Sequence, residues 1–285
     1  MNKIIDGRKL ADKILREVTL KTKFLKEKHN LVAKIVTILV GHNSASEIYI
    51  NAKLQMAKKV GIIGRLKRLS QDIIKTEFIT ELQKLNIDKT VTGILVQFPL
   101  PSHLDKNIVF NILDRKKDID GFGVYNTGLL HHNQADIMPC TPQGVLYILK
   151  EYFSNLSGKK VVVIGRSQIV GRPMAAILLN ENCTVTQVHS KTKNIQAECL
   201  RADIIIVAVG VAKFLCADWI QNGCFVVDVG MNREGNRLVG DTDFNNLLEK
   251  VSYITPVPGG VGPLTVANLM LNAIKLCYIQ NQIDW

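Results

Sequence analysis

The N-terminal part of the chain contains a tyrosine and a lysine at a spacing that suits chemistry on one helix face. Tyr49 and Lys53 stand in the stretch Tyr-Ile-Asn-Ala-Lys, and residues four apart share one face of a helix. A lysine whose pKa is lowered by partial burial or by a nearby positive charge can act as a general base. A helix lysine is also commonly a solvated surface residue, so the pair by itself leaves the chemistry undecided.

A glycine-rich turn in the second half of the chain is typical of phosphate-binding sites. Residues 160–164, apolar from Val161 on, are expected to form a strand that leads into Gly-Arg-Ser-Gln-Ile-Val-Gly, after which helix-forming residues resume. Glycines between a strand and a helix let the backbone approach a phosphate and direct free N–H groups at it. The spacing is not G-x-G-x-x-G, and simple closure of the turn is the alternative role. We predict cofactor contacts from Gly165, Arg166, Ser167, Ile169 and Gly171.

The charges near this turn favour NADP over NAD. The next expected strand, 185–188, ends in His-Ser-Lys instead of the Asp or Glu that accepts a ribose hydroxyl in NAD sites. We therefore expect Arg166 and Ser190 to hold a ribose 2′-phosphate. Ligands of doubly wound sheets bind outside the carboxyl ends of the strands, and three more turns follow expected strands. These turns supply the further predicted cofactor residues Gly210, Gly230 and Thr255.

The elements that position these residues alternate between buried strands and helices. The run 34–40 is apolar apart from Lys34 and Thr37, as in a strand buried on both faces. A helix carrying Lys53 is expected to follow it, with Ser44 to Ser46 as N-cap candidates. Helix 75–85 and strand 93–97 come next, and residues 118–144 are expected to be a long connection. A second strand–helix series and a final helix over 264–280 complete the pattern, which predicts α/β architecture with parallel sheets.

Composition limits the classes of function. The chain has 285 residues, 47% hydrophobic and 21% charged, with a net charge of +11. The basic residues are not interleaved with aromatic ones, so we expect polyanionic small molecules as ligands instead of nucleic acid. The six cysteines form no C-x-x-C pair, which predicts reduced thiols in a cytoplasmic protein and no metal site. We find no secretory signal and no apolar run long enough to cross a membrane.

Seven motifs occur in order along the chain: Tyr49-Ile-Asn-Ala-Lys53, Gly93-Ile-Leu-Val-Gln97-Phe-Pro-Leu-Pro101, Lys117-Asp-Ile-Asp120-Gly-Phe, Pro139-Cys-Thr-Pro-Gln-Gly144, Gly165 to Met174, Asp228 to Arg233 and Thr255 to Thr265. Together they resemble the bifunctional methylenetetrahydrofolate dehydrogenase/cyclohydrolases. The resemblance implies two α/β lobes flanking a cleft, the second a Rossmann-like doubly wound parallel sheet. It also implies oxidation of 5,10-methylenetetrahydrofolate with NADP, hydrolysis of the methenyl product to 10-formyltetrahydrofolate, and a homodimer.

The resemblance also implies roles for individual residues. Lys53 is expected to carry the proton in hydrolysis, with Gln97 orienting its amine and Asp120 anchoring the pterin. Tyr49 is expected to stack on the folate ring. Pro258, Gly259 and Gly260 form a corner expected to contact the substrate, a tetrahydrofolate derivative that carries one or more glutamates. Lobe boundaries are expected at 1–119, with helix 264–285 packing back onto that lobe, and at 120–263 for the NADP lobe.

Two departures and three alternatives accompany this resemblance. The family often has a second lysine where this chain has Gln55, and commonly a histidine where it has Gly123. A short-chain dehydrogenase also uses Tyr-x-x-x-Lys, but there the pair follows the glycine turn, whereas here it precedes Gly165. A dehydrogenase without hydrolase activity, or a basic nucleotide- or RNA-binding protein on the same scaffold, remain the other readings of the sequence.

Overall fold

The computed structural model describes residues 3–235 and 237–285, with only the backbone described at residues 44 and 45. The chain forms two compact units. The lysine unit, which contains Lys53, comprises Lys13–Leu129, Ala135–Met138 and Val266–Trp285. The glycine-turn unit, which contains Gly165, comprises Met1–Asp12, Leu130–Gln134 and Pro139–Thr265.

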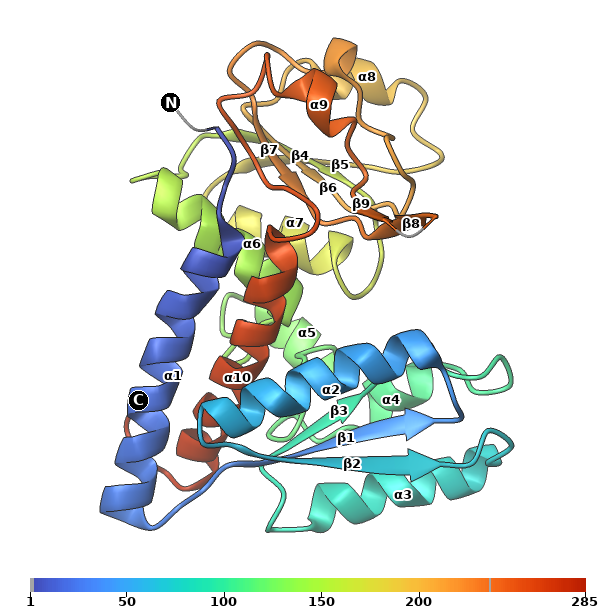
Figure 1. Cartoon of the computed structure of the whole chain (residues 1–285), viewed down its shortest axis with the longest axis vertical. Coiled ribbons are helices and arrows are strands. Elements are labelled where there is room, and N and C mark those ends of the chain that lie inside the picture. The colour runs from blue at the N-terminus through green and yellow to red at the C-terminus, as the bar shows by residue number, and fades with distance from the viewer. Residues whose placement is uncertain (1–2, 236) are drawn as a thin grey trace. The chain divides into compact units, whose positions relative to one another are not determined.

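The lysine unit is built on a parallel sheet of three strands in the order β2-β1-β3 (Figure 1). The strands are β1 (Lys34–Val40), β2 (Ile63–Leu69) and β3 (Gly93–Val96). Ile35 pairs with Gly64 on one side and with Gly93 on the other. Strand β1 is central, which explains why its sequence is a continuous apolar run without the alternation of a half-exposed strand.

Helices cover both faces of this sheet. The chain moves from β1 to β2 through α2 (Ser44–Lys59) and then crosses back to β3 through α3 (Lys75–Ile87). Because both crossovers are right-handed and run in opposite directions, the two helices lie on opposite faces (Figure 1). The unit is completed by α4 (Asn107–Ile112) and most of α5 (Val124–His131), together with parts of α1 (Gly7–His29) and α10 (Val261–Gln280).

The glycine-turn unit is built on a parallel sheet of five strands in the order β10-β7-β6-β4-β5. The strands are β4 (Lys160–Ile164), β5 (Thr184–Val188), β6 (Ile204–Val207), β7 (Phe225–Asp228) and β10 (Tyr253–Ile254). The chain places β5 on one side of β4 and then returns to place β6 on the other. The strand order therefore reverses between β4 and β6, which makes their carboxyl ends the point where such sheets bind ligands.

The helices of this unit lie on both faces of its sheet (Figure 1). They are α6 (Cys140–Tyr152), α7 (Gly171–Asn180), α8 (Ile195–Cys199), the 3-10 turn η1 (Ala217–Trp219) and α9 (Phe244–Leu247). A short antiparallel hairpin, β8 (Asn232–Glu234) and β9 (Arg237–Val239), follows β7. The predicted α/β class, with a Rossmann-like doubly wound parallel sheet in the second part, is confirmed.

Two local expectations were wrong, and one strand was not predicted. Helix α2 is capped by Asn43, whose side chain accepts the Ser46 N–H at 2.9 Å, and not by the serines. Residues 118–144 are not one long connection, because they contain α5 and the start of α6. Strand β2 was not predicted, because Arg65, Lys67 and Arg68 interrupt its apolar residues. Its charges fit an edge strand, which exposes one side to solvent.

Candidate functional site

Lys53 and Gln97 are brought together from two different elements of the lysine unit. Lys53 lies on α2, and Gln97 follows the last residue of β3. The Lys53 Nζ donates a hydrogen bond of 3.1 Å to the Gln97 Oε1. Gln97 is itself fixed, because its Nε2 donates to the Phe98 carbonyl at 2.8 Å and its backbone N–H donates to the Ile38 carbonyl at 2.9 Å. The amide oxygen is therefore held toward the amine, which orients it.

Tyr49 lies one helical turn before Lys53 on α2 and is 38% exposed. Its ring therefore offers a surface to a flat ligand on the same helix face as the amine. Gln55, two residues beyond Lys53, is exposed. A residue two positions away points to a different side of the helix, so the departure at Gln55 leaves the contact between Lys53 and Gln97 intact.

Asp120 lies in a loop that runs beside β3. Asp118 forms a parallel bridge with Ile94 of β3, so the chain at Asp120 reaches the same sheet edge as Gln97. Asp120 is half-buried and is followed by Gly121, whose φ of +68° a side chain would strain. The structure thus places the predicted anchor and the predicted orienting amide at the carboxyl edge of one sheet.

Asp118 shapes the loop that carries Asp120, and the sequence motifs did not single it out. Its Oδ2 accepts the Gly123 N–H at 2.7 Å and the Asn126 Nδ2 at 2.9 Å. Burial raises the pKa of this carboxyl above its ordinary value, although these hydrogen bonds oppose the rise. A Cβ at residue 123 would lie 3.0 Å from the Asp118 Oδ2. The glycine found here in place of the family's usual histidine therefore lets the backbone approach the carboxylate closely.

The glycine-rich turn between β4 and α7 requires its glycines. Gly165 has a φ of +125°, and a Cβ there would lie 2.4 Å from the Ala208 carbonyl oxygen. A Cβ on Gly171 would lie 2.3 Å from the Gly165 carbonyl oxygen. The Ser167 hydroxyl accepts the N–H groups of Val170 and Gly171, at 3.1 and 3.2 Å, and so fixes the start of α7. Ile169 is half-buried in the same turn.

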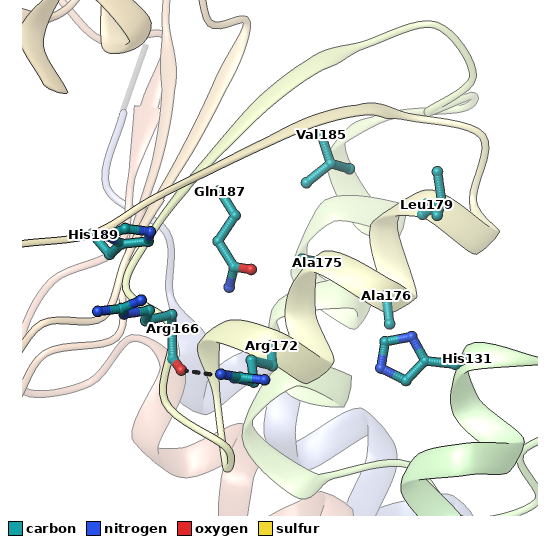
Figure 2. Close-up of a pocket in the computed structure, with 9 residues that line it drawn as sticks. All are labelled: His131, Arg166, Arg172, Ala175, Ala176, Leu179, Val185, Gln187 and His189. Atoms are coloured by element: carbon teal, nitrogen blue, oxygen red, sulfur yellow. Dashed lines mark hydrogen bonds between the residues drawn. The ribbon is translucent and has the colours of Figure 1, made fainter. Parts of the chain in front are cut away.

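A basic cavity of about 560 Å³ opens beside this turn. Figure 2 shows the guanidinium groups of Arg166 and Arg172 and the imidazoles of His131 and His189 arranged around it. The remaining lining residues are Ala175, Ala176, Leu179, Val185 and Gln187. The Arg172 Nε donates to the Arg166 carbonyl at 3.3 Å, and the Gln187 Nε2 donates to the Gly165 carbonyl at 3.0 Å. With four basic groups and no acidic one in its lining, the cavity suits an anion.

Ser190 lies next to His189 in a tight turn after β5 and is exposed. The turn is closed by the backbone hydrogen bond from the Thr192 N–H to the His189 carbonyl at 2.8 Å. The His189 N–H also donates to the Thr192 Oγ1 at 3.0 Å, and the Lys191 N–H donates to the His189 Nδ1 at 3.2 Å. Since Nδ1 accepts, the neutral ring carries its proton on Nε2. The structure thus keeps Ser190 within the same edge region as Arg166.

The three further turns predicted to line the cofactor differ in accessibility. Gly210 is exposed, with a φ of +68°, whereas Gly230 is buried. Thr255 is fully buried, and its hydroxyl accepts the Asp228 N–H at 2.7 Å. The Thr255 side chain therefore fastens one turn to another.

The Pro258-Gly259-Gly260 segment forms a backbone corner, as expected. Gly259 has a φ of +102°, and a Cβ on Gly260 would lie 2.5 Å from the Pro256 carbonyl oxygen. The Gly7 N–H donates to the Gly259 carbonyl at 3.0 Å. Close backbone contacts on both sides of the corner explain its glycines.

Two family models match the chain. The catalytic domain of tetrahydrofolate dehydrogenase/cyclohydrolase matches residues 5–120. The NAD(P)-binding domain of tetrahydrofolate dehydrogenase/cyclohydrolase matches residues 139–281. The chain belongs to the tetrahydrofolate dehydrogenase/cyclohydrolase family.

Relatives within this family resemble the chain over nearly its full length. The bifunctional protein FolD of Rickettsia massiliae is 46% identical over 277 residues, covering 96% of each chain. The crystal structure of the bifunctional enzyme FolD from Campylobacter jejuni has a TM-score of 0.94 at 43% identity and covers 98% of each chain. The Trypanosoma brucei enzyme, solved with NADP and an inhibitor, has a TM-score of 0.91 at 34% identity, covering 96% of each chain.

Among the described residues, no group of three or more His, Cys, Asp or Glu side chains is placed to hold a metal ion. No helix within 3–235 or 237–285 has the length and apolar character needed to cross a membrane.

The buried carboxyl of Asp118 predicts a pH dependence of stability. Because its pKa is raised by folding, its contribution to the free energy of unfolding is fully present below 3.8, the ordinary aspartate value, and is lost as the pH rises through the raised pKa. Asp118→Asn removes this titration. We expect the free energy of unfolding of the variant, measured by urea denaturation followed by circular dichroism, to decline less as the pH rises.

The matched control is Asp105→Asn, in the same unit. A backbone hydrogen bond from Asn107 lowers the pKa of this exposed carboxyl, so its contribution has the opposite sign and is lost as the pH falls. A pH dependence of unfolding that is the same in Asp118→Asn and in the wild-type protein would contradict the assignment.

Proposed function

We infer that the chain oxidises 5,10-methylenetetrahydrofolate to 5,10-methenyltetrahydrofolate with NADP and then hydrolyses the product to 10-formyltetrahydrofolate. Family membership supports both activities, since both domain models carry the dehydrogenase/cyclohydrolase description. The observation that carries the mechanism is the 3.1 Å hydrogen bond between Lys53 and Gln97. It holds an amine in a fixed position at the carboxyl edge of a parallel sheet, beside an aromatic ring.

Hydrolysis requires a water molecule to attack the bridging carbon of the methenyl cation. As the new C–O bond forms, the Lys53 amine takes a proton from the water. The proton then passes to the ring nitrogen that leaves as the C–N bond breaks, which restores the neutral amine. The remaining hydroxyl proton of the intermediate is released to solvent as the formyl C=O bond forms. A cationic substrate favours the neutral form of the lysine, because two positive charges repel each other at short range. Gln97 acts by accepting from the amine, which directs the amine's lone pair and remaining hydrogens.

Hydride transfer, unlike hydrolysis, requires no proton transfer by a side chain of the protein. The nicotinamide cofactor accepts the hydride when bound, and the chain's task is to hold the two reacting carbons at short range. We propose that Asp120 accepts hydrogen bonds from the pterin, that Tyr49 stacks on it, and that Pro258, Gly259 and Gly260 supply further substrate contacts. The domain boundaries at 1–119 with 264–285 and at 120–263 remain predictions.

The cavity beside the glycine turn supports a preference for NADP. Arg166 lies on the turn itself and lines the cavity, and Ser190 follows a residue that lines it. We propose that these two residues bind the 2′-phosphate, while Gly165, Ser167, Ile169 and Gly171 form the turn beneath the diphosphate. Gly210, Gly230 and Thr255 belong to the turns along the same sheet edge.

Three statements about the setting of the enzyme are also proposals. We propose that it is a homodimer, because members of the family that the sequence motifs resemble are usually homodimers. We propose a cytoplasmic location, because all six cysteines are free thiols. We propose folate derivatives, polyglutamylated ones included, and not nucleic acid, as the ligands that use the positive charge.

Lys53→Ala tests the proposed proton carrier. The kcat for hydrolysis of methenyltetrahydrofolate should fall by about 10²–10⁴-fold, the range typical for loss of a general base. Lys53→Arg should not restore the rate, because arginine keeps the charge but does not release its proton. The measurement is the loss of methenyl absorbance, with circular dichroism to check folding.

Lys58→Ala is the control for this substitution, since Lys58 is an exposed lysine on the same helix. It should hydrolyse the substrate at the wild-type rate. A rate for Lys53→Ala within twofold of wild type would refute the role. A wild-type protein that accumulates methenyltetrahydrofolate without hydrolysing it would instead be a dehydrogenase alone.

Arg166→Ala tests the cofactor preference. We expect kcat/KM for NADP to fall by about 10–100-fold, as expected for a lost charge-assisted contact with phosphate, while kcat/KM for NAD stays nearly constant. Arg201→Ala, at an exposed arginine of the same unit, should leave both values unchanged. An equal loss with both cofactors would show that Arg166 supports the turn and does not read the phosphate.

The proposed dimer predicts a solution mass twice that of the single chain. Size-exclusion chromatography with light scattering measures it directly over a range of protein concentrations. A mass equal to that of one chain throughout the micromolar range would rule out the dimer.

A further inference from the structure

Two carboxylates are buried at the ligand-binding edge of the five-stranded sheet, and neither belongs to the mechanism described above. Asp228 is the last residue of β7, and Asp241 follows the hairpin β8–β9. Their side chains are 1% and 0% exposed. Buried polar groups are usually hydrogen-bonded, so the groups that donate to these two carboxylates indicate what the carboxylates hold in place.

Asp241 accepts hydrogen bonds from the turn that follows β6. Its Oδ2 accepts the N–H groups of Val209 and Gly210 at 2.6 and 2.9 Å, and its Oδ1 accepts the Val211 N–H at 2.9 Å. The Asn232 Nδ2 donates to the same Oδ1 at 2.9 Å. Three consecutive backbone N–H groups that converge in this way form an anion site, and here the chain's own carboxylate occupies it.

Asp228 secures the neighbouring turns in the same manner. Its Oδ1 accepts the N–H groups of Gly230 and Asp241, both at 2.9 Å. Its Oδ2 accepts the Thr242 N–H at 2.8 Å and the Thr242 hydroxyl at 2.6 Å. Burial raises the pKa of this carboxyl, and the hydrogen bonds from Thr242 and Asp241 oppose that rise. Asp228 thus holds the backbone of Asp241, and the Asp241 side chain in turn holds the turn after β6.

The two glycines nearest these carboxylates leave no room for side chains. A Cβ on Gly230 would lie 2.1 Å from the Asp241 carboxyl carbon. A Cβ on Gly240 would lie 2.0 Å from the Asp228 Oδ2. The carboxylates and the turns are therefore packed at contact distance, so a displacement of Asp241 displaces the backbone that it holds.

The turn held by Asp241 forms one side of the point at which the strand order reverses. A Cβ on Gly165 would lie 2.4 Å from the carbonyl oxygen of Ala208, the residue just before Val209. The glycine turn after β4 and the turn after β6 are therefore in backbone contact. Ligands of doubly wound sheets bind between these two turns.

We propose that Asp241 is a positioning residue for the cofactor. It fixes residues 209–211 against the glycine turn, and Asp228 fixes Asp241. Because Asp241 accepts hydrogen bonds from the N–H groups of 209–211, these groups are not free to bind the cofactor's diphosphate. The diphosphate is thereby directed to the turn at 165–171. This inference rests on the proposed function and extends it to two residues that touch neither substrate nor the reacting atoms.

Asp241→Asn tests the proposal, because the two activities of the enzyme separate positioning from folding. The amide directs N–H groups at backbone N–H groups, so the turn loses at least one hydrogen bond and moves. We expect the Kd for NADP, by calorimetry, and the KM for NADP in the dehydrogenase reaction to rise by about tenfold or more. Hydrolysis of methenyltetrahydrofolate needs no cofactor, so its kcat/KM should stay within about twofold of wild type.

Asp203→Asn is the matched control. Asp203 precedes β6 at the opposite edge of the same sheet and accepts a backbone N–H, that of Lys160, at 2.9 Å. It should leave the affinity for NADP unchanged.

A second variant decides the matter if Asp241→Asn fails to fold. Asn232→Asp, at a half-buried hairpin position, places a carboxylate against the Asp241 Oδ1 and repels it. It should weaken NADP binding in the same direction. The proposal is overturned if the folded variants bind NADP as the wild-type enzyme does, or if both activities fall equally. A wild-type protein without dehydrogenase activity would instead overturn the proposed function, whatever the variants do.

Discussion

Backbone N–H groups at the carboxyl ends of parallel strands need acceptors, and buried carboxylates supply many of them in this chain. In the glycine-turn unit, Asp228 and Asp241 accept from the turns after β6 and β7 and from the segment after β9. A turn that leaves a sheet has no ladder partner, and an unmet buried N–H is destabilising by about 1–3 kcal/mol. The edge of the sheet formed by the carboxyl ends of its strands therefore depends on these two side chains.

In the lysine unit, the Asp118 carboxylate is the corresponding acceptor of hydrogen bonds from a loop at the sheet edge. It accepts from Gly123 and Asn126, and so closes the loop that carries Asp120. All three buried carboxylates have backbone or neutral side-chain donors, although the chain has 36 Lys and Arg residues. The Lys and Arg side chains therefore do not neutralise these three carboxylates. Arg166 and Arg172 line a cavity that no carboxylate lines, and Lys53 meets a neutral amide. A positive charge that is not neutralised internally remains available to an anionic ligand.

The sequence was informative wherever a residue's role depends on its neighbours along the chain. The runs that became β1 and β4 are apolar because both faces are covered, and the glycines at 165 and 171 have the φ or the close contacts that their turn predicts. Lys53 and Gln97 were predicted to interact only through the resemblance, since no periodicity relates residues 44 positions apart. Family membership required no structure, because seven motifs in order are specific.

The features that the sequence did not predict depend on contacts between distant segments of the chain. In the sequence, nothing distinguishes Asp241 from other aspartates that follow a glycine, because the N–H groups at 209–211 that it binds are distant along the chain. Asp118 is likewise not distinguished from Asp120 in the same motif. Strand β2 was concealed because an edge strand tolerates charge on the side that faces water. Asn43 was overlooked as the cap of α2 because two serines, Ser44 and Ser46, follow it as plausible caps, and the backbone conformation at residue 43 decides among them.

Both sheets reverse their strand order beside a central strand, β1 in one unit and β4 in the other. At such a reversal the turns after two adjacent strands diverge to opposite faces, so the space between their carboxyl ends is left open. In each unit the predicted functional groups gather there: Gln97 and Asp120 at the edge of the β1 sheet, and the glycine turn at the edge of the β4 sheet. Topology supplies the opening in both cases. The buried carboxylates then determine its shape, because they are the acceptors that hold the turns around it.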